Sequence, residues 1–222
     1  MSTEDAPKDR ARLRRKRERG SHDRAVIDAI LDEGLIAHVG IADERGRPVV
    51  TPTLHARCGD TVYCHGAVSS RTLRALGGGA EACGTVTLLD GLVLARSAMH
   101  HSANYRSVML FGVARPVSEP HEKLAALRAI VEHIVPGRWA DIGHPSENEL
   151  RATTVVALGI AEASAKVRSG QPIDDEEDYA LAAWAGVLPL RSVAGSPEPD
   201  PRMPAGVPVP GYARDYERPP AR

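Results

Sequence analysis

Apolar positions in the first third of the chain change from a helical period to strand-like alternation. Apolar residues between Val26 and Leu31 recur on one helical face and Gly34 stops the run, which predicts a helix over 22–33. Ser21 is the candidate N-cap of this helix. Strand-like patterns then cover 35–42, 48–58 and 61–66, separated by turns rich in charged residues or glycine. We therefore expect an antiparallel meander after the first helix.

The rest of the chain continues this mixture of strands and helices. The pattern predicts a short helix over 69–76, a hairpin of 82–89 and 92–97 about Asp90-Gly91, a strand over 105–117, an amphipathic helix over 119–135 and a strand over 153–166. There is no βαβ alternation and no internal repeat. A small closed barrel of six or more strands with two or three helices is therefore favoured over a doubly wound sheet.

The two ends of the chain differ in composition from the part between them. Residues 1–19 carry eight basic residues with hardly any apolar partner, which predicts a disordered basic arm. Such an arm could contact nucleic acid or an acidic surface, with the barrel as a scaffold. Residues 191–222 hold eight of the 17 prolines and are expected to form a disordered or extended tail. A single domain over 20–190 remains.

Composition narrows the class of protein further. With 222 residues and 42% apolar content, the chain is long enough to bury one hydrophobic core. Its net charge of −1 argues against a protein that binds nucleic acid over its whole surface. No apolar run approaches the length of a membrane span. Three cysteines and no apolar signal segment argue against disulfides, so we expect a cytoplasmic protein with reduced thiols. Cysteine and histidine spacings predict no metal site.

A polar segment over 97–112 stands directly before an apolar strand. Arg106 offers a planar fork that can grip a phosphate, and Tyr105 and Ser107 add neutral hydrogen-bonding groups beside it. The alternative is an ordinary polar turn with Arg106 on the surface. His100 and His101 stand in the same segment, either as proton donors near neutral pH or as solvent-exposed loop histidines.

Two further segments have candidate binding residues. Ser70 and Arg71 follow Gly66 where a strand gives way to a helix, which could seat a phosphate or could be a simple helix cap. Thr51-Pro52-Thr53 puts a proline inside a strand, which indicates an edge strand, a bulge or a groove lined by a ligand.

Taken in order, three segments together resemble the pyridoxamine 5′-phosphate oxidase-like flavin-nucleotide-binding proteins. These segments are 48–53, 65–71 and 104–112, and the resemblance extends from about Arg19 to Leu190, including the closing segment 184–189. It implies a β-rich α+β fold, namely a six-stranded antiparallel split β-barrel with two or three flanking helices. It also implies FMN bound at the interface of a homodimer, with both subunits lining each site.

The resemblance also assigns roles to residues. Thr51, Pro52 and Thr53 would run beside the isoalloxazine, and His65, Gly66 and Ala67 would continue that wall. Ser70 and Arg71 would meet the ribityl phosphate. Further phosphate and ribityl contacts, from the same or the partner chain, would come from Tyr105, Arg106 and Ser107. Trp184 would stack on the flavin or substrate, or else fill a core or dimer interface.

The function implied is an FMN-dependent oxidoreductase acting on a small molecule. The arginine-rich closing segment that grips pyridoxine phosphate in the namesake enzyme is missing, so the resemblance does not imply vitamin B6 as the substrate. A nitroimidazole reductase-like activity, with His100 or His101 as proton donor, fits the resemblance. The alternative is a non-enzymatic flavin, haem or deazaflavin carrier or sensor, in which His100 or His101 could be an axial ligand.

Overall fold

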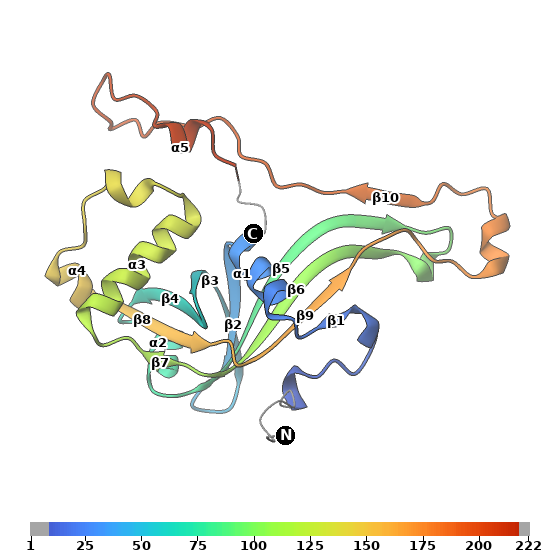
Figure 1. Cartoon of the computed structure of the whole chain (residues 1–222), viewed down its shortest axis with the longest axis horizontal. Helices are drawn as coiled ribbons and strands as arrows, with labels where there is room; N and C mark the ends of the chain where they lie inside the picture. The colour runs from blue at the N-terminus through green and yellow to red at the C-terminus, as the bar shows by residue number, and fades with distance from the viewer. Residues whose placement is uncertain (1–8, 218–222) are drawn as a thin grey trace.

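The protein folds around one curved antiparallel sheet, which the computed structural model describes over residues 9–217 (Figure 1). Its strands are β1 (Gly20–Ser21), β2 (Ile36–Ala42), β3 (Pro48–Cys58), β4 (Thr61–Ala67), β5 (Glu81–Leu94), β6 (Ser102–Val113), β7 (Arg115–Pro116), β8 (Thr153–Gly159), β9 (Glu162–Arg168) and β10 (Gly186–Pro189). Their order is β1-β9-β6-β5-β2-β3-β4-β8-β7, with β10 paired to β5. The β-rich α+β class is confirmed. The described part has ten strands where six were expected, because β1, β7 and β10 are too short to leave a periodic pattern and because the single strand expected over 153–166 is divided into β8 and β9.

Three predicted helices are present and two short ones were missed. The helices are α1 (Arg24–Glu33), α2 (Arg71–Gly77), α3 (Pro120–Ile134), α4 (Glu147–Ala152) and α5 (Gly211–Arg214). Single 3₁₀ turns are η1 (Asp9–Ala11), η2 (Arg17–Arg19), η3 (Ala98–His100), η4 (Arg138–Asp141) and η5 (Glu176–Ala180). The cap of α1 is Asp23, not Ser21: the Asp23 carboxylate accepts from the backbone N–H of Ala25.

The main core lies between α1 and the inner face of the sheet. Ile30 and Leu31 of α1 pack with Val86, Val108 and Ala165, all at most 1% exposed. Burying a side chain such as Leu31 contributes about 1.5–3 kcal/mol. A second, smaller cluster lies where α3 packs on β8. These contacts hold α1 and α3 in fixed positions against the sheet.

Strand β3 changes partner in the middle. Residues Pro48–Leu54 pair with β2, and His55–Cys58 pair with β4. Thr51-Pro52-Thr53 therefore has a partner strand on one side only within the described sheet. A proline is tolerated there because it has no N–H to donate to a second neighbour.

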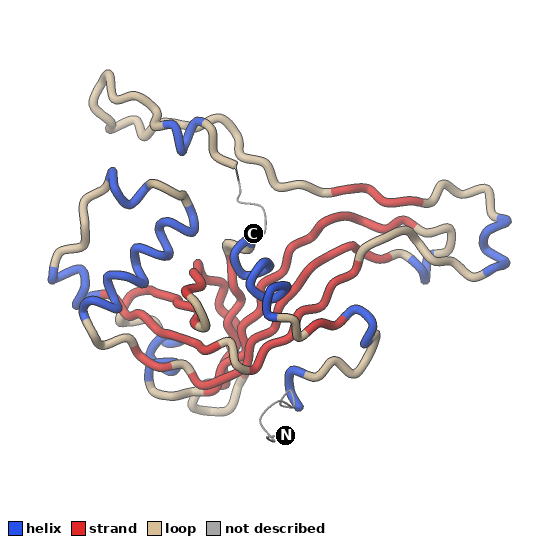
Figure 2. The backbone as a smooth tube through the Cα atoms, in the orientation of Figure 1, coloured by secondary structure: helices blue, strands red, loops and turns tan. Residues whose placement is uncertain are grey.

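The β5–β6 hairpin extends far beyond the rest of the sheet as an arm, seen at the right of Figure 2. β2 pairs with β5 only from Ala82 to Val86, whereas the β5–β6 pairing continues to Val93, and β10 joins there as a third strand. The predicted turn at Asp90-Gly91 is wrong, because β5 runs through it with only an irregularity in register. Gly91 does not have the positive φ that a two-residue hairpin turn requires. Its missing side chain instead lets β10 approach, since a Cβ there would lie 3.0 Å from the Leu188 carbonyl oxygen.

Both ends of the described chain contact the domain. Residues 1–8 of the predicted basic arm and 218–222 of the predicted tail lie outside the described residues. From η1 onward the basic N-terminal segment packs on β9: the Arg10 guanidinium lies 2.9 Å from the Glu162 carboxylate and Ala11 is buried. The tail has little regular structure after β10, but the Tyr216 hydroxyl donates to the Ile134 carbonyl, 2.9 Å away, at the end of α3. No described helix is long and apolar enough to cross a membrane.

Candidate functional site

A cavity of ≈ 270 Å³ lies where β3, the end of β4 and α2 meet. Its lining includes seven of the residues singled out from the sequence: Thr51, Pro52, Thr53, His65, Gly66, Ala67 and Ser70. Apolar walls are supplied by Val39 of β2 and by Leu73 and Leu76 of α2. The fold thus brings together two segments that are separate in the sequence. It does so at the point where β3 has a partner strand on one side only.

Some hydroxyls of this cavity have partners within the chain. The Thr51 and Thr72 hydroxyls lie 2.8 Å apart and tie β3 to α2. The Ser70 hydroxyl accepts a hydrogen bond from the Leu73 N–H at 3.4 Å and caps α2, as one interpretation of the sequence held. Positioning of α2 against β3 therefore depends on the same residues that line the cavity.

His65 is the polar group of the cavity whose hydrogen bonding is incomplete. Its Nδ1 atom is fully buried and has no hydrogen-bond partner among the described residues. Burial lowers the pKa of His65, so the imidazole is neutral at pH 7. A buried polar atom without a partner costs about 1–3 kcal/mol. The site therefore fits a ligand that offers a polar edge to Nδ1.

Gly66 and Cys64 define the remaining wall of the cavity. A Cβ on Gly66 would lie 2.8 Å from Leu73 Cδ1, so the glycine keeps space open between β4 and α2. Burial raises the pKa of the Cys64 thiol to about 12. Cys64 is therefore a neutral thiol at physiological pH and not a thiolate nucleophile.

Arg71 lies outside this cavity, in an adjoining cleft of ≈ 900 Å³. Thr72 lines both spaces. Arg45, Arg47 and Arg74 also line the cleft, and sequence reasoning missed all three. Arg47 pairs with Asp43 at 2.7 Å. Hydrogen bonds from Arg47 lower the pKa of Asp43, and the charge of Arg71 lowers it further. Within residues 9–217 the guanidiniums of Arg45, Arg71 and Arg74 form no ion pair. The charged turn over 43–47 was the available signal, but the sequence did not reveal that it lies beside α2.

Arg106 does not offer a free fork to an anion. Its guanidinium is held by Glu33 of α1 and by Asp90, whose carboxylate oxygens lie 2.8 and 3.0 Å from Nη2 and Nε. These carboxylates raise the pKa of Arg106. Tyr105 and Ser107 project to the opposite face of β6, because successive side chains of a strand alternate. The three residues expected around one phosphate are therefore divided within a single chain between two faces.

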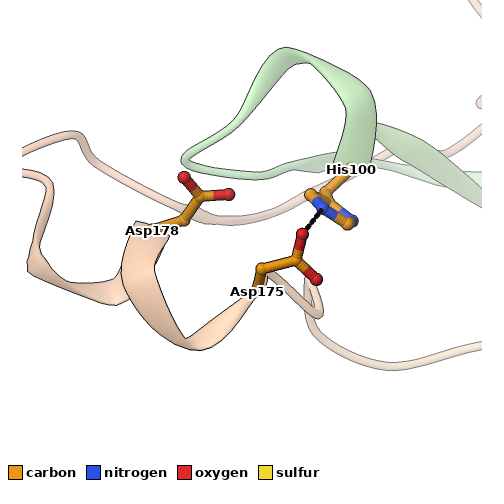
Figure 3. A group of neighbouring side chains, drawn as sticks. All are labelled: His100, Asp175 and Asp178. Carbon is orange, nitrogen blue, oxygen red and sulfur yellow. Dashed lines mark hydrogen bonds and ion pairs between the residues drawn. The ribbon is translucent and has the colours of Figure 1, made fainter.

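His100 ends η3, His101 follows it before β6, and Trp184 lies two residues before β10. None of the three lines the cavity. The His100 Nε2 atom is 3.3 Å from the Asp175 carboxylate, with Asp178 beside it, as Figure 3 shows. The His101 Nδ1 atom is 3.0 Å from the Ser97 carbonyl oxygen, and its side chain is exposed. Trp184 is 71% exposed.

The chain resembles known proteins over most of its length. A family model described as pyridoxamine 5′-phosphate oxidase matches residues 23–167. The flavocytochrome Anf3 from Azotobacter vinelandii is 45% identical, with 96% of this chain and 98% of that chain covered and a TM-score of 0.89.

Two further solved structures are similar to different degrees. An FAD- and haem-binding protein from Mycobacterium smegmatis is 38% identical over 89% of this chain and 96% of that one, with a TM-score of 0.84. A putative 5-nitroimidazole antibiotic resistance protein from Bacteroides thetaiotaomicron is 25% identical over 67% and 86%, with a TM-score of 0.57. No curated protein matches the chain. The family resemblance that the ordered motifs predicted is confirmed: the chain belongs to the pyridoxamine 5′-phosphate oxidase family.

Proposed function

We propose that this protein binds a flavin nucleotide, with the ring in the cavity between β3, β4 and α2, and that it works as an oxidoreductase on a small molecule. The observation that carries the proposal is the buried Nδ1 atom of His65, which has no partner in the described chain and lies in the wall of a partly apolar cavity. A bound flavin supplies the electron transfer. FAD-binding and flavocytochrome relatives at 38% and 45% identity support it.

The residues of the cavity bind and orient the ring. Val39, Leu73 and Leu76 provide apolar surface for a flat aromatic ring, and they exclude water from it. The backbone of Thr51-Pro52-Thr53 offers polar groups on the side of β3 that has no partner strand. His65 is neutral and completes its hydrogen bonding with the polar edge of the ring.

The phosphate end of the flavin is assigned to the adjoining cleft. Arg71 and Arg74 lie one helical turn apart on α2, and neither forms an ion pair among the described residues. A flavin phosphate is an anion that guanidiniums bind at two points. At ≈ 900 Å³ the cleft can take the ribityl phosphate of FMN or the adenosine diphosphate end of FAD. Extraction of the cofactor and measurement of its mass identify which of the two is bound.

A homodimer is the second part of the proposal. The arm presents exposed apolar side chains, among them Leu89, Met99, Leu181, Trp184 and Leu188, each between 50 and 88% exposed. Apolar groups gathered in this way are typical of an interface. A second copy covering the arm would also bring Tyr105 and Ser107 near a partner's flavin. Light scattering that compares wild type with Trp184→Ala tests the homodimer. We expect the variant to shift towards the monomer.

The test of flavin binding uses the purified protein. We expect flavin absorption to persist through gel filtration, and His65→Phe and the double variant Arg71→Gln/Arg74→Gln to lose it. Arg151→Gln, an exposed arginine on α4, is the matched control and should retain flavin. A wild type that takes up neither FMN nor FAD on reconstitution contradicts the proposal.

Haem is a second candidate cofactor. Both of the more identical relatives are described as cytochrome or haem-binding proteins. In this chain the His100 imidazole has a carboxylate neighbour, Asp175, and the residue before it, Met99, has an exposed side chain. A carboxylate partner orients an imidazole and makes it a stronger axial ligand.

The haem candidate has its own readout. We expect a Soret band that His100→Ala removes and His101→Ala retains, since His101 is directed to a backbone carbonyl. If both variants keep the band, the ligand role of His100 is contradicted. Deazaflavin, the remaining alternative, is separated from FMN and FAD by the mass of the extracted cofactor.

A further inference from the structure

Three side chains that can bind a metal meet at the tip of the arm, where η3 lies between β5 and β6. The imidazole of His100 and the carboxylates of Asp175 and Asp178 offer one ligand atom each, and these atoms all lie within 4.8 Å of one another (Figure 3). Spacing along the sequence did not reveal this group, because His100 and Asp175 are 75 residues apart. We call these three residues the η3–η5 cluster.

The turn that begins η5 brings the two carboxylates to one side. The Asp178 N–H donates to the Asp175 carbonyl at 2.9 Å and closes a 3₁₀ turn. Residues three apart in such a turn are eclipsed, so the two side chains point the same way. Asp175 is the N-cap residue of η5, yet its carboxylate accepts no capping hydrogen bond. In the described chain the hydrogen-bond partner of this carboxylate is the His100 ring, at 3.3 Å.

Contacts outside the cluster hold its two halves in place. The Asp174 carboxylate is buried and accepts from the backbone N–H groups of Arg96 and Ser97 at 3.0 and 3.3 Å. The Arg96 guanidinium lies 3.1 Å from the same carboxylate and 4.9 Å from the centre of the Tyr179 ring. The His100 N–H in turn donates to the Ser97 carbonyl at 3.2 Å. The protein therefore positions the three side chains by itself, which is what a metal site requires of its support.

The spacing within the cluster suits a small ion of tetrahedral geometry. The His100 Nε2 atom and the Asp175 carboxylate oxygen are 3.3 Å apart. With metal bonds of about 2.0–2.2 Å, two ligands of a tetrahedral Zn²⁺ ion are separated by roughly 3.4 Å. Asp178 can reach the same ion by a rotation of its side chain, since all three atoms already lie within 4.8 Å of one another.

Negative charge surrounds the cluster in excess. Residues 174–178 are five consecutive acidic residues, and Arg96 is the one arginine or lysine that pairs with them within residues 9–217. The side chain of Asp175 is 72% exposed and that of His100 is 29% exposed. An ion can therefore enter from solvent and keep a water molecule as its fourth ligand. Its charge would offset the repulsion among these carboxylates.

We propose that His100, Asp175 and Asp178 form a binding site for a divalent transition-metal ion such as Zn²⁺. An imidazole nitrogen favours zinc and its neighbours in the first transition row over Mg²⁺ and Ca²⁺, which prefer oxygen ligands. The bound ion would tie η3 to η5 and so fix the tip of the arm. None of the three residues lines the cavity or the arginine-lined cleft, so flavin and metal can bind independently.

The metal site and haem ligation by His100 exclude each other. As an axial ligand of haem iron, the imidazole would bind through Nδ1 and keep on Nε2 the proton that the Asp175 carboxylate accepts. As a ligand of the smaller ion, Nε2 has no proton. A Soret band that His100→Ala removes would therefore overturn the metal site.

Calorimetric titration of the full chain with Zn²⁺, without an affinity tag and after treatment with a chelator, tests the proposal. We expect wild type to bind one ion per chain, and His100→Gln and Asp178→Asn to bind it at least about tenfold more weakly, because each variant loses a ligand. Glu177→Gln is the matched control, since it removes the same charge from the same acidic run but no ligand. It should bind Zn²⁺ as wild type does, and so should His101→Gln.

Amide hydrogen exchange locates the ion in the wild-type chain without any substitution. Zn²⁺ should slow exchange in residues 97–101 and 174–180 and leave the core unchanged. Protection in another part of the chain, or a wild type that binds no Zn²⁺, would overturn the site. Equal weakening in Glu177→Gln and Asp178→Asn would also overturn it, because it would show attraction of the ion to the acidic run alone.

Discussion

His55 should make the stability of the protein fall steeply in mild acid. The ring is 0% exposed at the point where β3 changes partner, and its Nε2 atom donates to the Leu31 carbonyl at 3.1 Å. Nδ1 is then the unprotonated nitrogen, and it has no hydrogen-bond partner in the described structure. Burial lowers the pKa of His55 from 6.5 to about 4, with the nearby His133 adding to the shift and Asp32 opposing it.

The magnitude follows from proton linkage. The unfolded chain protonates His55 near pH 6.5 and the folded chain only near pH 4, so acid favours the unfolded state between these values. The stabilisation is complete above the unfolded pKa and is lost as the pH falls through this window. Between pH 7 and pH 4.5, His55 alone should remove about 2 kcal/mol from the free energy of unfolding.

The assay is urea unfolding of wild type and His55→Gln at several pH values in this range. Glutamine keeps a donor for the Leu31 carbonyl but does not titrate, so the difference between the two proteins isolates the imidazole from the carboxylates and from His65. We expect the variant to lose about 2 kcal/mol less than wild type on acidification. Parallel pH profiles for the two proteins would refute the reasoning.

Three other substitutions test the site and the arm. Arg106→Ala should lower stability by about 2 kcal/mol in urea unfolding, because it removes the positive charge that pairs with both the Asp90 and the Glu33 carboxylates, while flavin content per folded protein stays unchanged. A loss of flavin without a loss of stability would restore the phosphate role for Arg106. Gly66→Val should weaken flavin affinity at least tenfold in a fluorescence titration, since the new side chain fills the cavity; unchanged affinity would place the ring elsewhere. Asp174→Asn removes the charge that pairs with the Arg96 guanidinium, so amide exchange should become faster at the tip of the arm and not in the core; equal exchange rates at the tip in wild type and variant would contradict this.

The sequence predicted well those features that depend on local pattern. The helices over α1, α2 and α3 follow from apolar spacing and stop signals, and the meander of β2, β3 and β4 follows from alternation. The order of three short motifs also pointed to the family. Each of these signals lies within a few residues of the element it predicts.

What the sequence could not reveal depends on contacts across the chain. Arg106 is a free anion-binding residue by its local sequence, and only the fold brings Glu33, 73 residues away, to neutralise it. Asp90-Gly91 has the composition of a turn, but pairing with β6 and β10 on both sides of β5 keeps it extended. Arg45 and Arg74 are surface arginines until the β2–β3 turn and α2 are seen to border one cleft.

The position of β9 in the sheet determines where the chain can be shortened. The family match ends at residue 167, inside β9, and begins after β1. A chain trimmed to 23–167 would lose β1 from one side of β9 and β10 from one side of β5, baring unpaired backbone groups along both strands. Exposed strand edges of this kind recruit other chains and lead to aggregation. Fragments for expression should therefore begin before Gly20 and extend beyond Pro189, although both ends lie outside the matched segment.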